Sequence, residues 1–88
     1  MAIVHIPSLL RDLTAGTARV TVSGRTLRQV IHNLDDQFPG LRGRLLDEDG
    51  ELQPEIAVAI DGGTEHLGLI QPLMEHTEVH FIPAVSGG

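Results

Sequence analysis

The stretch EVHFIPAVSGG, residues 78–88, joins an alternating apolar run to two glycines at the end of the chain. The alternation and the β-branched and aromatic residues predict a strand over residues 77–83. Successive side chains of a strand point to opposite faces of the sheet. We therefore expect one side of this strand in the core and one side exposed, with Val79 and Phe81 inward and His80 and Ile82 outward.

The last two residues, Gly87 and Gly88, lack Cβ atoms and can adopt backbone angles that are closed to other residues. A terminal carboxylate on such an arm could enter the narrow channel of an activating enzyme. We therefore predict a domain over residues 1–83 followed by a flexible tail over residues 84–88. A frayed terminus would have the same appearance, so the remainder of the chain must decide between the two interpretations.

The composition limits the class of protein. The 88 residues suffice for one domain, and two Phe with no Trp or Tyr predict an aliphatic core. A net charge of −6 argues against nucleic acid as a partner, and the lack of cysteine excludes disulfides and thiolate metal sites. No apolar run approaches the roughly 20 residues of a membrane span. The N-terminus lacks the basic segment of a signal peptide, so we expect a cytoplasmic protein without a membrane partner.

The first half of the chain predicts a hairpin followed by one helix. Residues 2–7 and 17–23 are β-branched and alternating, which is typical of paired strands. Residues 26–38 carry apolar side chains at the spacing of one helical face. Thr26 and Gln29 fit a capping box at the start of this helix, and Pro39 cannot continue it. Residues 41–46 would add a short second helical turn.

The second half predicts a third strand over residues 55–61, a tight turn, a short fourth strand near residues 65–67 and the final strand. This order, with a single amphipathic helix, describes an α+β roll built on one mixed sheet. The helix would cross one face, and the first and last strands would pair in parallel at the centre. The other sheet face would be open to solvent.

We expect the open face of the sheet to be a docking surface for a protein partner. Alternation places Val4 and Ile6 inward, so that Ile3 and His5 point outward from the same strand. A patch of exposed apolar side chains on a small protein is typical of an interaction site. Its predicted members are Ile3, His5, His80, Ile82 and the alanines at positions 57 and 59.

The other chemically active side chains do not form the pattern of an enzyme. His76 and His80 have a metal-like spacing, but on a strand they would not converge, so we expect no metal site. The chain also lacks a nucleophile elbow and a phosphate-binding loop. Asp35 and Asp36 are interpreted as solvated side chains on the polar side of the helix. The terminal carboxylate is then the one chemically distinctive group.

Taken together, these features resemble the MoaD/ThiS family of ubiquitin-like sulfur carriers, which have the β-grasp fold. The resemblance covers nearly the whole chain and is closest to the carriers of cysteine synthesis. The stretches that support it are IPSLLRDLTAG at residues 6–16, LRGRLLDEDGELQP at residues 41–54 and PLMEHTEVHFIPAVSGG at residues 72–88.

The resemblance implies a mechanism centred on Gly88. An E1-like adenylating enzyme would use ATP to adenylate the carboxylate of Gly88, and a sulfur donor protein would displace AMP to leave a thiocarboxylate. A downstream synthase would accept the sulfur. The chain itself would bind no cofactor and would not be an enzyme. Gly87 would enter the active site with Gly88, and the arm from the sheet would consist of Pro83, Ala84, Val85 and Ser86.

Several functions share this activation step. The first is sulfur delivery for cysteine or a related metabolite, and the second is the small subunit of molybdopterin synthase. A third is a protein modifier that is joined through Gly88 to lysines of targets. The chain contains no lysine, so it cannot carry such a bond on its own side chains. The remaining alternative is a β-grasp interaction domain whose Gly-Gly tail is inert.

Overall fold

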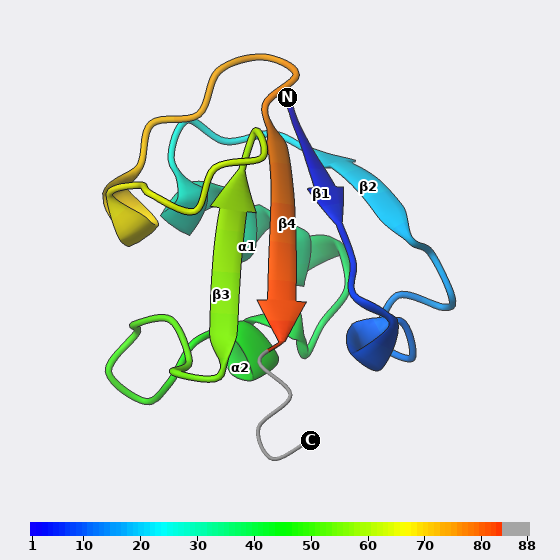
Figure 1. The fold of residues 1–88 in the computed structure, drawn as a ribbon. Helices are drawn as coiled ribbons and strands as arrows, with labels where there is room; N and C mark the ends of the chain where they lie inside the picture. Colours follow the sequence, from blue (N-terminus) through cyan, green and yellow to red (C-terminus); the bar gives the residue numbers. More distant parts are fainter. Residues whose placement is uncertain (84–88) are drawn as a thin grey trace.

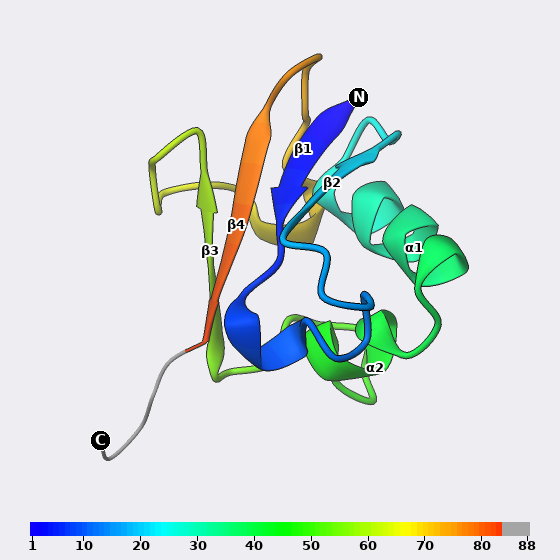
Figure 2. The same cartoon turned by 90° about the vertical axis from the view of Figure 1, so that its right-hand side faces the viewer.

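The computed structural model describes residues 1–83, which form a mixed sheet with helices on one side (Figures 1 and 2). The strand order in the sheet is β2-β1-β4-β3. β1 and β2 are antiparallel, β1 and β4 are parallel, and β4 and β3 are antiparallel. The four strands are β1 (Ala2–His5), β2 (Arg19–Val22), β3 (Ile56–Ile60) and β4 (Glu78–Pro83).

The main helix, α1 (Leu27–Gln37), lies across the inner face of the sheet, and the short α2 (Leu41–Leu45) follows it (Figure 2). Two single 3-10 turns, η1 (Ser8–Leu10) and η2 (Gly68–Ile70), occur in the connections. None of the helices in residues 1–83 has the length and apolar character needed to cross a membrane. The predicted α+β architecture, including the crossover helix, is confirmed.

The parallel pairing of the first and last strands is also confirmed. Val4 is the register partner of Val79, and His5 is the register partner of His80. β4 therefore lies between β1 and β3 and has a hydrogen-bonded neighbour on each side. β1 and β4 are therefore the two central strands of the sheet, and β4 leads into the tail.

The core between the sheet and α1 is almost wholly aliphatic. Inward-facing side chains of β1 and β4 meet the apolar side of α1 there, as alternation predicted. Phe81 is the one aromatic side chain among the buried residues, and Phe38 packs at the edge of the cluster. The residues without exposed surface include Val4, Val22, Leu27, Val30, Ile31, Leu34, Leu41 and Val79.

The start of α1 follows the predicted capping arrangement with one change. The Thr26 hydroxyl accepts a hydrogen bond from the backbone N–H of Gln29 at 3.3 Å. The Gln29 side chain accepts from the backbone N–H of Arg25, at 2.8 Å, one residue before the cap. The Thr26 hydroxyl thus satisfies a backbone donor that the helix start leaves unpaired, and the Gln29 side chain holds the residue before the cap. α1 ends at Gln37, directly before the Phe38-Pro39 pair.

The prediction of a short strand near residues 65–67 was wrong. The chain makes only an isolated bridge between Ile60 and Gly63 and then turns away from the sheet edge. His66 holds this segment instead, with one ring nitrogen 2.9 Å from the carbonyl oxygen of Val58. Its other nitrogen accepts from the N–H of Gly68, which begins η2. The His66 side chain therefore makes a contact with the edge of β3 that the predicted strand near residues 65–67 would have made through its backbone.

The interpretation of Asp35 as a solvated side chain was also wrong. Its carboxylate accepts hydrogen bonds from the backbone N–H groups of Gly40 and Arg42, each at 3.1 Å. Gly40 is the N-cap of α2 and has no side chain with which to cap that helix. Asp35 supplies the missing acceptor from five residues earlier in the chain. Asp36 is exposed, as predicted.

Candidate functional site

The outer face of β1 and β4 carries the side chains that were predicted to point away from α1. Ile82 is 46% exposed, while Ile3, His5 and His80 are half-buried. The inward or outward direction predicted for each of these residues is confirmed. Their function in binding a partner stays a prediction.

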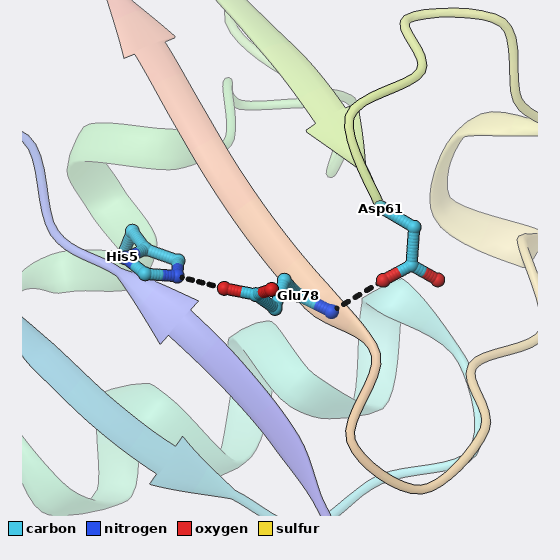
Figure 3. Close-up of polar contacts among 3 residues, drawn as sticks. All are labelled: His5, Asp61 and Glu78. Atoms are coloured by element: carbon cyan, nitrogen blue, oxygen red, sulfur yellow. Dashed lines mark hydrogen bonds and ion pairs between the residues drawn. The ribbon is translucent and has the colours of Figure 1, made fainter.

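The two histidines of this face lie side by side because they are register partners in the parallel pair. Their imidazole rings stack with centroids 3.9 Å apart and an angle of 4° between the ring planes. His5 Nε2 also lies 2.8 Å from Oε1 of Glu78, and Figure 3 shows this contact. In this geometry the Nε2–H group of His5 donates to the carboxylate, because a carboxylate can only accept.

Glu78 is held in place by Asp61, which follows β3. The backbone N–H of Glu78 donates to Oδ1 of Asp61 at 2.9 Å (Figure 3). The N–H of Asp61 in turn donates to the carbonyl oxygen of Glu78 at 2.8 Å. Asp61 has a left-handed backbone with φ of 50°, a conformation that Asp tolerates better than most residues. The start of β4 is therefore fixed by a reciprocal contact with the end of β3.

A shallow groove of about 500 Å³ lies where β4 approaches its end. The groove runs from the two histidines toward η1. Among residues 1–83, its walls include Arg11 and Arg19 but no acidic residue. Arg11 is positioned by a hydrogen bond from its Nε to the carbonyl oxygen of Ile6 at 3.1 Å. In a chain with net charge −6, this groove is therefore a local basic surface, and it shares His5, His80 and Ile82 with the predicted docking face.

One part of the predicted docking surface is not exposed. Ala57 is exposed, but Ala59 is only 7% exposed. Ala59 is the register partner of His80, and its single methyl group is much shorter than the imidazole beside it. The apolar character of the outer face therefore comes mainly from Ile3 and Ile82.

The predicted arm begins at the last residue that the structure describes. Pro83 ends β4, and its register partner is Ile56 at the start of β3. The remaining predicted site residues, Ala84, Val85, Ser86, Gly87 and Gly88, lie outside the described residues. The domain boundary at residue 83 stays a prediction.

The two histidines and Glu78 together have the composition of a metal site. The ligand atoms of His5, Glu78 and His80 all lie within 4.8 Å of one another. His76, whose spacing from His80 we expected not to bring the two rings together on a strand, is not a member of the cluster found among residues 1–83. His76 lies in the turn before β4 with φ of 65°, and its N–H donates to the carbonyl oxygen of Met1.

Sequence reasoning missed the contributions of Glu78, Asp61, Arg11 and Arg19. Glu78 could have been found, because it shares a strand face with His80, two residues further on. Arg19 could have been found from the hairpin register, which pairs it with His5. The positions of Arg11 and Asp61 depend on the paths of loops, which no alternation pattern specifies.

The sheet order, the single crossover helix and the central parallel pair define the class of ubiquitin-like β-grasp domains. Comparison with solved structures supports this assignment. A chain of the Amycolatopsis orientalis BexX/CysO complex superposes with a TM-score of 0.92 at 28% identity, with all of both chains covered. The CysO structure from Mycobacterium tuberculosis gives a TM-score of 0.90 at 30% identity, covering 97% of this chain and 100% of the other.

The chain belongs to the ThiS family, which matches residues 4–88. The sulfur carrier protein CysO of M. tuberculosis is 33% identical over 89 aligned positions, which cover 97% of this chain and 96% of the relative. The small archaeal modifier protein 3 of Haloferax volcanii is 37% identical over 65 positions, which cover 72% of this chain and 70% of that protein. These relatives are named as carriers and modifiers.

Proposed function

We propose that this protein is a sulfur carrier whose Gly88 carboxylate is adenylated and then converted to a thiocarboxylate. The chain acts as a carrier of the CysO type and not as an enzyme, since its family and its nearly full-length relatives are carriers. The observation that carries the proposal is that the family match runs through β4 and the Gly-Gly tail to residue 88.

The position of β4 supports the use of the tail as a reactive arm. β4 is hydrogen-bonded to β1 and to β3, so Pro83 leaves the sheet from a fixed point. Five residues follow Pro83, and an extended chain of this length can span at most about 17 Å. A rigid domain can thus remain outside an active site while Gly88 reaches the bound nucleotide.

The two proposed steps need no catalytic side chain from this protein. A carboxylate oxygen of Gly88 attacks the α-phosphate of ATP, and pyrophosphate leaves. A sulfide-level nucleophile from a donor protein then adds to the carbonyl carbon, and AMP leaves with the transferred oxygen. The product is a thiocarboxylate, in which sulfur has replaced one oxygen of Gly88. Two glycines suit this step, because they lack side chains that would obstruct a narrow channel.

We assign the outer sheet face to recognition of the activating enzyme. Ile3 and Ile82 would supply the apolar contacts, and His5 and His80 would lie beside them on the same two strands. The basic groove with Arg11 and Arg19 would face acidic side chains of the partner. The A. orientalis complex, which pairs a CysO protein with BexX, supports an enzyme as the kind of partner.

The carrier would hold no cofactor of its own. ATP would be bound and consumed by the E1-like adenylating enzyme, and the sulfur would come from a separate donor protein. Because this activation consumes ATP, we place the protein in the cytoplasm. The named relatives favour a downstream synthase that uses the thiocarboxylate in the synthesis of cysteine or a related sulfur metabolite.

A second candidate function is a protein modifier. It is favoured by the likeness to the H. volcanii small archaeal modifier protein 3. In that function the activated carbonyl of Gly88 would be attacked by a lysine amine of a target, and AMP would again be the leaving group. The third candidate, the small subunit of molybdopterin synthase, requires a stable complex with a larger subunit.

The decisive experiment is the intact mass of the untagged protein recovered from its own cells, together with a variant that lacks Gly87 and Gly88. We expect a species heavier by the difference between sulfur and oxygen, with the change mapped to Gly88. The truncated protein should remain folded and should show no such species. Gly63→Ala serves as the matched control, because an added Cβ there meets only the Ile60 carbonyl oxygen at 3.6 Å.

The outcomes separate the candidates. An unmodified mass in sulfur-replete cells, with no ATP-dependent adenylation of Gly88 in lysate, would refute the carrier proposal and favour an inert interaction domain. Isopeptide adducts of Gly88 on target lysines, without a thiocarboxylate, would favour the modifier. Co-purification with a larger subunit of matching stoichiometry would favour molybdopterin synthase.

A further inference from the structure

We propose that His5, Glu78 and His80 form a binding site for a divalent transition-metal ion, with Zn²⁺ as the natural probe. The inference is independent of the Gly88 chemistry. It rests on three metal-ligating side chains that the sheet register brings to one point of the outer face, with ligand atoms all within 4.8 Å of one another.

The register of two central strands creates this cluster. Glu78 and His80 are two residues apart on β4, so both side chains point to the same face. His5 on β1 is the partner of His80 in the parallel pair and points the same way. The backbone that presents the three ligands is fixed by hydrogen bonds on both sides of β4, so no loop has to become ordered when an ion binds.

The ligand types and spacing suit zinc. Two imidazoles and one carboxylate form a common zinc ligand set, which leaves a coordination position for water. Bond lengths of 2.0–2.1 Å in a tetrahedral site place neighbouring ligand atoms about 3.3 Å apart. The widest pair of ligand atoms therefore has to close by up to about 1.5 Å, and the His5–Glu78 pair, now 2.8 Å apart, has to open by about 0.5 Å. Side-chain rotations that also unstack the parallel rings of His5 and His80 would supply these changes. All three side chains have exposed surface, which permits such rotations.

Without an ion, a proton of His5 lies between His5 and Glu78, at the position where the proposed metal ion would bind. Nε2–H of His5 now bridges to Oε1 of Glu78 across 2.8 Å. Binding of Zn²⁺ at Nε2 requires loss of that proton, because metals bind the neutral imidazole through an unprotonated nitrogen.

Charges on the neighbouring strands act in opposite directions. Arg19 on β2 is the partner of His5 and adds a positive charge on one side of the site. Asp61 at the end of β3 lies on the other side, within hydrogen-bond distance of the Glu78 backbone (Figure 3). Ala59, beside His80, carries no charge. Arg11 lines the same groove as the two histidines and, like Arg19, opposes a bound cation, so the attraction for the ion comes from the carboxylates of Glu78 and Asp61.

The three remaining histidines provide internal comparisons. Both ring nitrogens of His66 already contact backbone groups of Val58 and Gly68, so this ring is not available as a ligand without loss of those contacts. His32 is exposed on α1, away from the sheet face, and His76 lies in the turn before β4. None of these three belongs to the cluster found among residues 1–83.

The test is calorimetric titration of the untagged full chain with ZnCl₂ at pH 7.5, with circular dichroism to verify that each variant is folded. We expect one ion per chain with micromolar affinity, and at least a tenfold loss of affinity in His80→Ala and in Glu78→Gln. His32→Ala is the matched control and should bind as the parent does.

A second measurement identifies the ligands directly. On addition of Zn²⁺, the imidazole Cε1–H resonances of His5 and His80 should shift together, while those of His32 and His76 stay in place. The proposal is overturned if the parent shows no saturable binding below millimolar Zn²⁺. It is equally overturned if Glu78→Gln and His80→Ala, both folded, bind as tightly as His32→Ala, since binding would then lie elsewhere on the chain.

Discussion

Val4 in β1 and Val79 in β4 are partners in the parallel strand pair, and neither side chain has exposed surface. The first and last strands of the chain thus meet at the centre of the sheet. The strand that leads to the C-terminal tail is therefore anchored by residues from the opposite end of the sequence. Side chains that point inward from β4 should control stability, and those that point outward should control recognition.

Two adjacent residues of β4 allow this division to be tested. Phe81 is buried in the core, whereas Ile82 points outward and is 46% exposed. Phe81→Ala should lower the free energy of unfolding by about 3–5 kcal/mol, because it removes buried contacts and leaves a cavity. Ile82→Ala should lower it by less than about 1 kcal/mol. Urea denaturation followed by circular dichroism measures both, and equal losses would contradict the assignment of faces.

The docking surface can be tested with two exposed isoleucines in different places. Ile82→Glu puts a charge on the proposed contact surface, so ATP-dependent activation of Gly88 should slow at least tenfold at limiting partner concentration. Ile70→Glu, on η2, changes a side chain that is 66% exposed and lies outside that surface. The readout is the rate of thiocarboxylate formation in lysate of the native host. Equal rates for the two variants would remove the outer face from the mechanism.

The capping function of Asp35 can be separated from its charge by comparison with its neighbour. Asp35→Ala should cost about 1–2 kcal/mol of stability, because the N–H groups of Gly40 and Arg42 lose their acceptor. Asp36→Ala removes the same charge from an exposed position and should change stability by no more than about 0.5 kcal/mol. Thermal and urea unfolding of the two variants would refute the capping function if both were equally stable.

Gly24 is the glycine whose replacement should be least tolerated. Its φ is 151°, and an added Cβ would lie 2.8 Å from Cγ2 of Val30 and 2.9 Å from the Val30 backbone nitrogen. We expect Gly24→Ala to cost at least about 2 kcal/mol, because backbone at the start of α1 would have to move. Gly43→Ala, within α2, meets no atom within 4 Å and should be neutral or slightly stabilising. Chemical denaturation measures the free energy of unfolding of both variants. Equal stability of Gly24→Ala and Gly43→Ala would contradict the expected clash at Gly24.

Local patterns in the sequence predicted most of the fold. The apolar spacing of residues 27–38 and the cap at Thr26 specify α1, because helix periodicity and capping depend on neighbours within a few residues. Alternation likewise gave the inward and outward residues of β1 and β4. The parallel pairing of the first and last strands was expected from the order of the elements around one crossover helix, and the structure agrees with it.

The errors concern contacts that neither periodicity nor propensity specifies. The segment before η2 was assigned to a strand, but His66 fixes it to the carbonyl oxygen of Val58 instead. Asp35 was interpreted as solvated, because its capping partner Arg42 lies beyond the helix end. Ala59 was expected to be exposed, because alternation gives the direction of a side chain but not the size of its neighbours.

The sequence by itself determined the helix, the faces of the central strands and the resemblance carried by the Gly-Gly tail, because each of these is local in the chain. Only the tertiary structure decided that Glu78 lies 2.8 Å from His5, residues separated by 73 positions. It also decided that the imidazole of His80 stacks on that of His5. Such contacts depend on the register between strands and on side-chain rotamers, which are fixed when the whole sheet packs against α1.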